Sequence, residues 1–177
     1  MRRLLLLCAL SGCASAATQT EATTAKQAVI FQGENGTIYA ERPRATMVTI
    51  AAPAATVWLA TKKVYADLDI PLTVDNPAMH QLGNQNFVKT RQFAGESMTQ
   101  LVDCGSGMTG PKAASYRIYM SLLTLVTGDG KGGTTVQTTF VPMGQDMSGG
   151  SSDRIPCGTT GRLEAIVLDK IKSASGK

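Results

Sequence analysis

The amino-acid sequence predicts an α+β fold, with an antiparallel sheet of about five to seven strands and two amphipathic helices on one face. Strand-like segments joined by short Gly- and Asn-rich turns fill the middle of the chain. An amphipathic helical pattern precedes most of them, and a second one follows them all. Because strands joined by hairpin turns pair antiparallel, helices at the two ends of such a run pack on one face of the sheet.

The first expected elements form a hairpin and a single strand. AVIFQ (28–32) and TIYA (37–40) flank GENG, whose Asn35-Gly36 pair suits a tight turn with positive φ. ATMVTIAA (45–52) alternates and is rich in β-branched residues, which is typical of a strand.

Two helices are expected. The first begins near Pro53 and ends before Pro71, and its apolar stripe recurs at steps of three and four residues: Val57, Ala60, Val64, Leu68. The second begins near Thr159, and its stripe consists of Leu163, Ile166, Val167 and Ile171.

The region between the helices predicts four or five strands. LTVD (72–75) is followed by AMHQL (78–82) and FVKTRQFA (87–94), which a GNQN turn joins. MTQLVDC (98–104) fits either a short strand or a turn of helix.

A long hairpin follows. ASYRIYMSLLTLV (114–126) predicts a long strand, and TTVQTTFV (134–141) returns after GDGKGG. Five residues would share one side of the first strand: Tyr116, Ile118, Met120, Leu122 and Val126. Residues 144–156 form a polar loop rich in Gly and Ser.

The N-terminus predicts export. MRR and LLLLCAL form a short basic and apolar leader, which is shorter than the roughly 20 apolar residues that a membrane span needs. Leu10-Ser11-Gly12-Cys13 resembles the lipobox of bacterial lipoproteins, which implies a diacylglyceryl thioether on Cys13 and cleavage before it. Ala14-Ser15-Ala16 offers the alternative, release of an unlipidated chain after Ala16. We therefore expect a signal peptide over 1–12, a lipidated flexible spacer over 13–25 and one domain over 26–177.

The charge of the chain argues against nucleic-acid binding, and its cysteines favour a disulfide in an exported domain. Removal of Arg2 and Arg3 lowers the net charge from +4 to +2, and no basic patch interleaved with aromatic residues points to nucleic acid. Cys104 and Cys157 remain in the exported domain, where a disulfide is the expected state. It would close a loop of about 54 residues and stabilise the fold by roughly 4 kcal/mol.

No group of residues predicts catalysis, a metal site, a cofactor or a nucleotide. GSGMTG (105–110) has the glycine spacing of a dinucleotide fingerprint, but Pro111 follows at once, so we expect a turn instead of the start of a helix. His80 is the only histidine, and no nucleophile motif accompanies it. We therefore expect a protein that is not an enzyme.

The order of elements over about residues 45–172, with Trp58 in the first helix, resembles helix-grip domains. Among exported proteins, it resembles those of a lipoprotein accessory subunit of the outer-membrane β-barrel assembly machine. The Asp103-Cys104-Gly105, Cys157 and Gly161–Glu164 segments are similar to those of uncharacterised bacterial lipoproteins. This resemblance implies a domain held at the outer membrane and facing the periplasm, with a soluble periplasmic or secreted protein as the alternative.

Two functions remain open. The first is a tethered, non-enzymatic module that binds an envelope protein or has a structural role, attached to the lipid membrane through Cys13. The second is a carrier of an apolar small molecule or lipid, because a helix-grip sheet can enclose a cavity. Seven residues would line that cavity: Trp58, Tyr65, Phe87, Phe93, Tyr116, Met120 and Phe140.

Overall fold

Two twelve-residue strands, β11 (Arg117–Gly128) and β12 (Thr134–Gln145), are the longest strands of the computed structural model. The structure describes residues 29–33, 36–40, 46–149 and 152–176. β11 and β12 pair along their whole length, from Arg117 opposite Gln145 to Gly128 opposite Thr134. The predicted turn between them is confirmed, and in it Asp129 Oδ1 accepts hydrogen bonds from the backbone N–H groups of Lys131 and Gly133.

A six-stranded antiparallel sheet is built on this hairpin. β5 (Gln81–Thr90) pairs with the free side of β11, and β4 (Val74–Asn76) forms the edge beyond it. On the other side, β3 (Thr46–Ile50) pairs with the first part of β12, and β13 (Arg154–Pro156) pairs with its last residues. The predicted α+β class with an antiparallel sheet in a single domain is thus confirmed.

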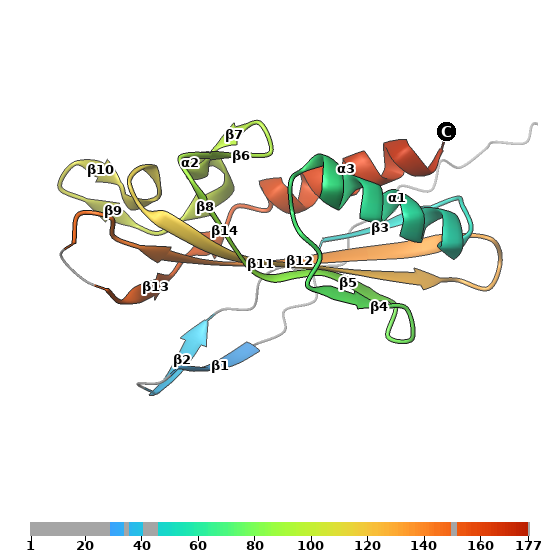
Figure 1. Ribbon diagram of the computed structural model, residues 1–177, viewed down its shortest axis with the longest axis horizontal. Coiled ribbons are helices and arrows are strands. Elements are labelled where there is room, and N and C mark those ends of the chain that lie inside the picture. The colour runs from blue at the N-terminus through green and yellow to red at the C-terminus, as the bar shows by residue number, and fades with distance from the viewer. Residues whose placement is uncertain (1–28, 34–35, 41–45, 150–151, 177) are drawn as a thin grey trace, which may run out of the picture.

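The two predicted helices are confirmed and cover one face of the sheet (Figure 1). α1 (Ala54–Asp67) begins directly after Pro53 and buries Val57, Ala60 and Val64. α3 (Arg162–Ser175) begins later than predicted, because the short strand β14 (Gly158–Thr159) precedes it and Gly161 adopts a left-handed conformation with φ 83°. The apolar stripes of both helices therefore close the core from one side.

A buried hydroxyl network joins α1 to the hairpin. The Tyr65 hydroxyl donates to the carbonyl of Leu122 at 3.3 Å and lies 2.9 Å from the Thr124 hydroxyl, which in turn lies 3.1 Å from that of Thr138. Burial raises the pKa of Tyr65, so the phenol stays protonated. The network satisfies the polar atoms that the helix and sheet bury between them.

The predicted GNQN turn is wrong, because β5 continues through it. Gly83 approaches β11 so closely that a Cβ there would lie 2.2 Å from the Leu122 carbonyl oxygen. The buried Asn84 side chain donates to the Pro71 carbonyl oxygen and accepts from the backbone N–H of Asn86 at 2.7 Å. The pairing with β11 shifts at this point, so the polar residues form a bulge inside one strand and do not end it.

Other predicted strand boundaries also move. Most of the predicted strand over 78–82 is a turn that leads into β5, and the strand predicted over 72–75 is β4, two residues later at its start. The segment 87–94 divides, since β5 ends at Thr90 and β6 (Gln92–Phe93) pairs with β7 (Glu96–Ser97) in a separate small hairpin.

Short elements gather at the end of the molecule where β11 begins (Figure 1). The ambiguous segment 98–104 contains both structures, α2 (Met98–Leu101) and then β8 (Val102–Asp103). β9 (Ser106–Gly107) and β10 (Gly110–Pro111) form a tight hairpin, and the 3₁₀ helix η1 (Lys112–Ala114) leads into β11. β12 extends four residues beyond the predicted strand, and β13 occupies the end of the predicted polar loop.

The N-terminal hairpin is confirmed by its backbone pairing. β1 (Val29–Gly33) pairs with β2 (Gly36–Ala40), with Val29 opposite Ala40. Cys13, the predicted signal peptide over 1–12 and the predicted spacer over 13–25 lie outside the described residues. No helix of the described part of the chain is long and apolar enough to cross a membrane.

Glu164 makes the stability of the fold depend on pH. It is fully buried in the first turn of α3, where the Thr159 hydroxyl donates to Oε1 at 2.8 Å. Burial raises the pKa of this carboxyl above its usual value, against the opposing effect of its hydrogen bonds. The folded state therefore holds this proton more tightly than the unfolded chain, and the free energy of unfolding falls as the pH rises from the unfolded pKa through the folded one.

Glu164→Gln keeps an acceptor for Thr159 and removes the charge. We expect the free energy of unfolding at neutral pH to rise by about 1 kcal/mol, with little gain at acidic pH. Urea denaturation of both proteins between about pH 4 and pH 7 measures this difference. An equal pH dependence in the two proteins would show that Glu164 does not cause it.

Candidate functional site

The sheet face opposite the helices is the most extensive candidate surface. Along each strand, the described residues of this face alternate with the buried residues of the opposite face. Residues that pair on neighbouring strands form rows that run across the sheet. Three of its apolar side chains are more than one-third exposed, namely Met47 at 43%, Val88 at 41% and Leu125 at 37%. Eight apolar residues lie on the face: Met47, Val74, Val88, Tyr119, Leu123, Leu125, Val141 and Met143.

This outer face carries very little charge. Its remaining strand positions are mainly Thr, Ser, Gln and Asn, and none of its described residues is Asp, Glu or Lys. Arg117 and Arg154 are its only charged residues, and both lie in the row that begins at Thr90 and passes through Gln145. The face is therefore neutral over most of its length and positive at one end.

Tyr119 marks the boundary between the neutral and positive parts. The Arg154 guanidinium carbon lies 3.6 Å from the centre of the Tyr119 ring, and the Tyr119 hydroxyl donates to Gln145 Oε1 at 2.8 Å. A hydrogen bond with Arg117, together with the positive charges of Arg117 and Arg154, lowers the pKa of Tyr119. A guanidinium stacked on an aromatic ring keeps its N–H groups available at the ring edge for an acceptor from a partner.

A disulfide bond organises the end of the sheet beside these arginines. Cys104 and Cys157 lie at disulfide distance, with 1.99 Å between the sulfur atoms, as the sequence predicted. Gly144 of β12 lies directly beneath this bond, and a Cβ there would be 3.0 Å from Cys157 Sγ and 2.9 Å from Cδ2 of Tyr116. The absence of a side chain at Gly144 thus allows the disulfide and the Tyr116 ring to pack on the end of β12.

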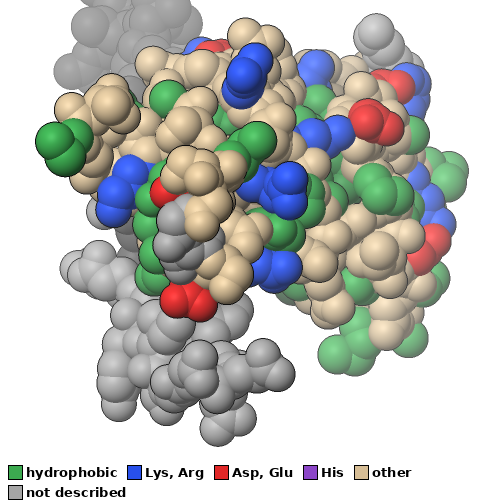
Figure 2. Space-filling view, turned by 60° about the vertical axis from the view of Figure 1, so that its left-hand side comes forward, with side chains coloured by type: hydrophobic (Ala, Val, Ile, Leu, Met, Phe, Trp, Pro, Cys, Tyr) green, Lys and Arg blue, Asp and Glu red, His purple; other side chains and the backbone are tan. Residues whose placement is uncertain are grey.

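A pocket of about 600 Å³ opens beside Tyr116. It lies where β5 ends and β11 begins, between the β9–β10 turn and the loop after β12. Arg91 and Lys112 line it, and neither forms a salt bridge with a described residue. Figure 2 turns this end of the molecule toward the viewer and shows Lys and Arg side chains spread over its surface.

Comparisons of the chain with protein-family models, with curated proteins and with solved structures found no match. The function is therefore inferred from the surfaces of this chain alone.

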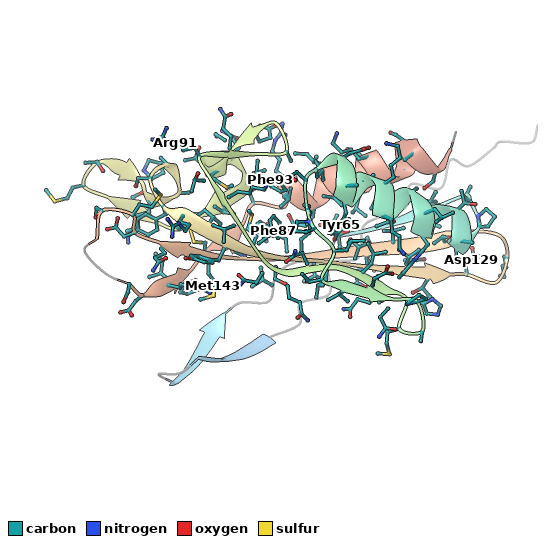
Figure 3. The ribbon with its side chains drawn as sticks, viewed as in Figure 1. Tyr65, Phe87, Arg91, Phe93, Asp129 and Met143 are labelled. Atoms are coloured by element: carbon teal, nitrogen blue, oxygen red, sulfur yellow. A yellow bond between two sulfur atoms is a disulfide. The ribbon has the colours of Figure 1, made fainter. Side chains whose placement is uncertain are left out.

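The residues predicted to line an apolar cavity mostly lie in the core. Tyr65, Phe87 and Phe93 point into the layer between the sheet and the elements above it (Figure 3), and the rings of Phe87 and Phe93 lie 5.5 Å apart. Met120 and Phe140 are also buried, whereas Trp58 and Tyr116 are half-buried. Of these seven residues, only Tyr116 lines the pocket described above.

Two further sequence features have structural roles. GSGMTG forms the β9–β10 hairpin, so the predicted turn is confirmed. His80 is exposed in the turn before β5 with φ 53°, and its carbonyl oxygen accepts a hydrogen bond from the Val126 N–H at 2.8 Å. Among the described residues, no cluster of three or more His, Cys, Asp or Glu could hold a metal ion.

The sequence analysis missed the outer face and the pocket. One sequence signal pointed to the face, since Leu122, Leu123, Leu125 and Val126 make β11 apolar on both sides, a pattern typical of strands covered on both faces. No sequence signal identified the pocket, because its walls come from three separate segments whose proximity depends on strand register.

We expect the disulfide to hold the short elements against the sheet. Replacing both cysteines, as Cys104→Ser together with Cys157→Ser, should lower the free energy of unfolding by about 4 kcal/mol, because the unfolded chain regains the freedom of a loop of about 54 residues. Urea denaturation of the oxidised protein and the double variant tests this. Equal stabilities would show that the bond does not support the fold.

Proposed function

We propose that this chain is a lipid-anchored module of the bacterial cell envelope that binds a protein partner through the outer face of its sheet. The observation that carries the proposal is the composition of that face, with eight apolar side chains and no described Asp, Glu or Lys. Contiguous exposed apolar surface on a folded domain commonly marks an interaction site.

The residue types of the outer face support a protein partner. Interface centres are depleted in Lys, Glu and Asp and enriched in Met, aromatic residues and Arg. Met47, Met143, Tyr119, Arg117 and Arg154 match this composition. The threonines and glutamines between them can donate and accept hydrogen bonds, so a partner could cover the face without leaving polar groups unpaired.

The carrier function has less support. A helix-grip arrangement, which we propose for this sheet and its two helices, can enclose an apolar cavity, but the aromatic residues expected to line one pack in the core. A filled interior leaves little room for an apolar ligand, because protein cores are packed to the density of organic crystals. Protein binding is therefore the better supported function.

The proposed location follows from Leu10-Ser11-Gly12-Cys13, since a diacylated cysteine would anchor the domain stably and residues 13–25 would act as its spacer. We place the domain at the outer membrane, facing the periplasm. The alternative is a soluble periplasmic or secreted protein that begins at Ala17.

Mass spectrometry of protein purified from membranes tests the anchor. We expect the mass of residues 13–177 plus acyl chains, and we expect Cys13→Ser to lose the acyl mass and the membrane association. An unlipidated mass that starts at Ala17 would reject the anchor while leaving the sheet-face proposal to be tested separately.

Charge substitutions on the outer face test the proposed docking surface. Val88→Lys and Leu125→Lys place an ammonium group on exposed positions of the face, where it should disrupt a desolvated contact without disturbing the core. We expect each to reduce crosslinking to the envelope partner about tenfold or more, which corresponds to about 1.4 kcal/mol.

Leu59→Lys is the matched control, because Leu59 is 67% exposed on α1, on the opposite side of the sheet. Crosslinking in whole envelopes followed by quantification of the adduct compares the three variants with the wild type. A protein that remains monomeric, or an equal loss in all three variants, would contradict docking through the outer face.

A further inference from the structure

The pocket at the disulfide end has the volume of a small-ligand site and is open to solvent, since none of its lining residues is buried. Its volume of about 600 Å³ lies within the range of ligand pockets, which is roughly 300–1,000 Å³. Three separate segments meet around it, and Tyr116 forms one wall beside Gly144 and the disulfide. The ring is therefore held in position by a covalently constrained part of the fold.

The charges around the pocket favour an anion. Arg91 and Lys112 both line it without a salt bridge to a described residue. A single carboxylate, that of Asp146, faces the same space, and hydrogen bonds from Ser148 lower its pKa and keep it ionised. Two cations against one anion leave a positive site, which attracts a negatively charged ligand.

The backbone of Arg91 is left-handed at the turn that follows β5. Arg91 has φ 61°, a left-handed conformation that residues other than glycine adopt only at an energetic cost. The Met98 N–H donates to the Arg91 carbonyl oxygen at 2.7 Å and fixes this turn. Arg91, which Figure 3 labels, directly follows the end of β5.

The remaining lining residues favour a ligand with many hydroxyl groups. Thr109, Ser115 and Ser148 carry hydroxyls that both donate and accept, and the Asp146 carboxylate accepts only. Asp146 would repel a bare inorganic anion but would accept hydrogen bonds from the hydroxyls of a sugar. We propose that this pocket binds an acidic saccharide, with its carboxylate or phosphate on Arg91 and Lys112 and its hydroxyls on Asp146 and the neighbouring hydroxyl side chains.

This site adjoins the positive end of the proposed docking face at Thr90, and its test does not require a protein partner. The experiment measures binding of D-glucuronate and glucose 6-phosphate to the full domain by calorimetry and by NMR shifts of pocket residues. We expect both acidic sugars to bind, and we expect glucose, acetate and inorganic phosphate to bind at least tenfold more weakly. Absence of binding by the acidic sugars, or equal binding of inorganic phosphate, would overturn the proposal.

Arg91→Gly separates ligand binding from folding. Glycine adopts the left-handed conformation freely, so this variant should melt at the same temperature as the wild type or higher while losing tenfold or more in affinity for the acidic sugars. Ala94→Gly is the matched control, because Ala94 has φ 52° in the next turn and carries no charge. We expect Ala94→Gly to bind as the wild type does, and unchanged binding by Arg91→Gly would overturn the proposal.

Asp146→Asn tests the part of the site that recognises hydroxyls. Asparagine can keep the hydrogen bond from the Ser148 N–H and removes the negative charge, so we expect binding of inorganic phosphate to strengthen relative to D-glucuronate. An unchanged ratio would reject the role assigned to Asp146.

Vesicles distinguish the source of the saccharide. Binding to phosphatidylinositol vesicles as well as to free glucose 6-phosphate would support a sugar-bearing lipid headgroup as the ligand. Binding to the free sugar alone would support a soluble saccharide, and binding to neither would overturn the proposal.

Discussion

The six-stranded sheet and the two long helices are positioned by the continuous pairing of β11 with β12. β5 and β4 extend the sheet from β11, whereas β3 and β13 share the other side of β12. The two helices pack on the inward side chains of the same hairpin, including Ile118, Leu122 and Phe140. Because strand register fixes which face each side chain occupies, a slip of one residue would exchange the buried and exposed faces of the whole domain.

Threonine occurs on both faces of this hairpin. The threonines of the inner face are buried and form hydrogen bonds, whereas those of the outer face are half-buried or exposed. Thr124 and Thr138 are buried in the Tyr65 network, and the Thr134 hydroxyl donates to the Ala52 carbonyl oxygen at 2.6 Å. Thr135 and Thr139 point to the outer face, where they remain half-buried. The inner face therefore gains polar links to α1 and to the end of β3, and the outer face keeps its hydrogen-bonding groups for a partner.

Periodicity was enough to predict both long helices and the β11–β12 hairpin, because each depends on contacts local in sequence. It failed at GNQN, where the Asn84 amide bonds to Pro71 across thirteen residues and allows the strand to continue. It also could not predict the short elements around the disulfide, which contain too few residues each to show a period. The row of Thr90, Arg117, Gln145 and Arg154 is assembled from four strands, so no local pattern could reveal it.

The disulfide and the predicted N-terminal leader both favour an oxidising compartment outside the cytosol as the location of this protein. Tyr116 and the segment that begins at Cys104 form walls of the pocket, and the disulfide fastens that segment to the start of β14. A reducing compartment would open this bond and release the walls, because cytosolic thiols are kept reduced. An oxidising compartment, such as the periplasm that we propose for this domain, would keep the bond formed and with it the link between the Cys104 segment and the end of the sheet.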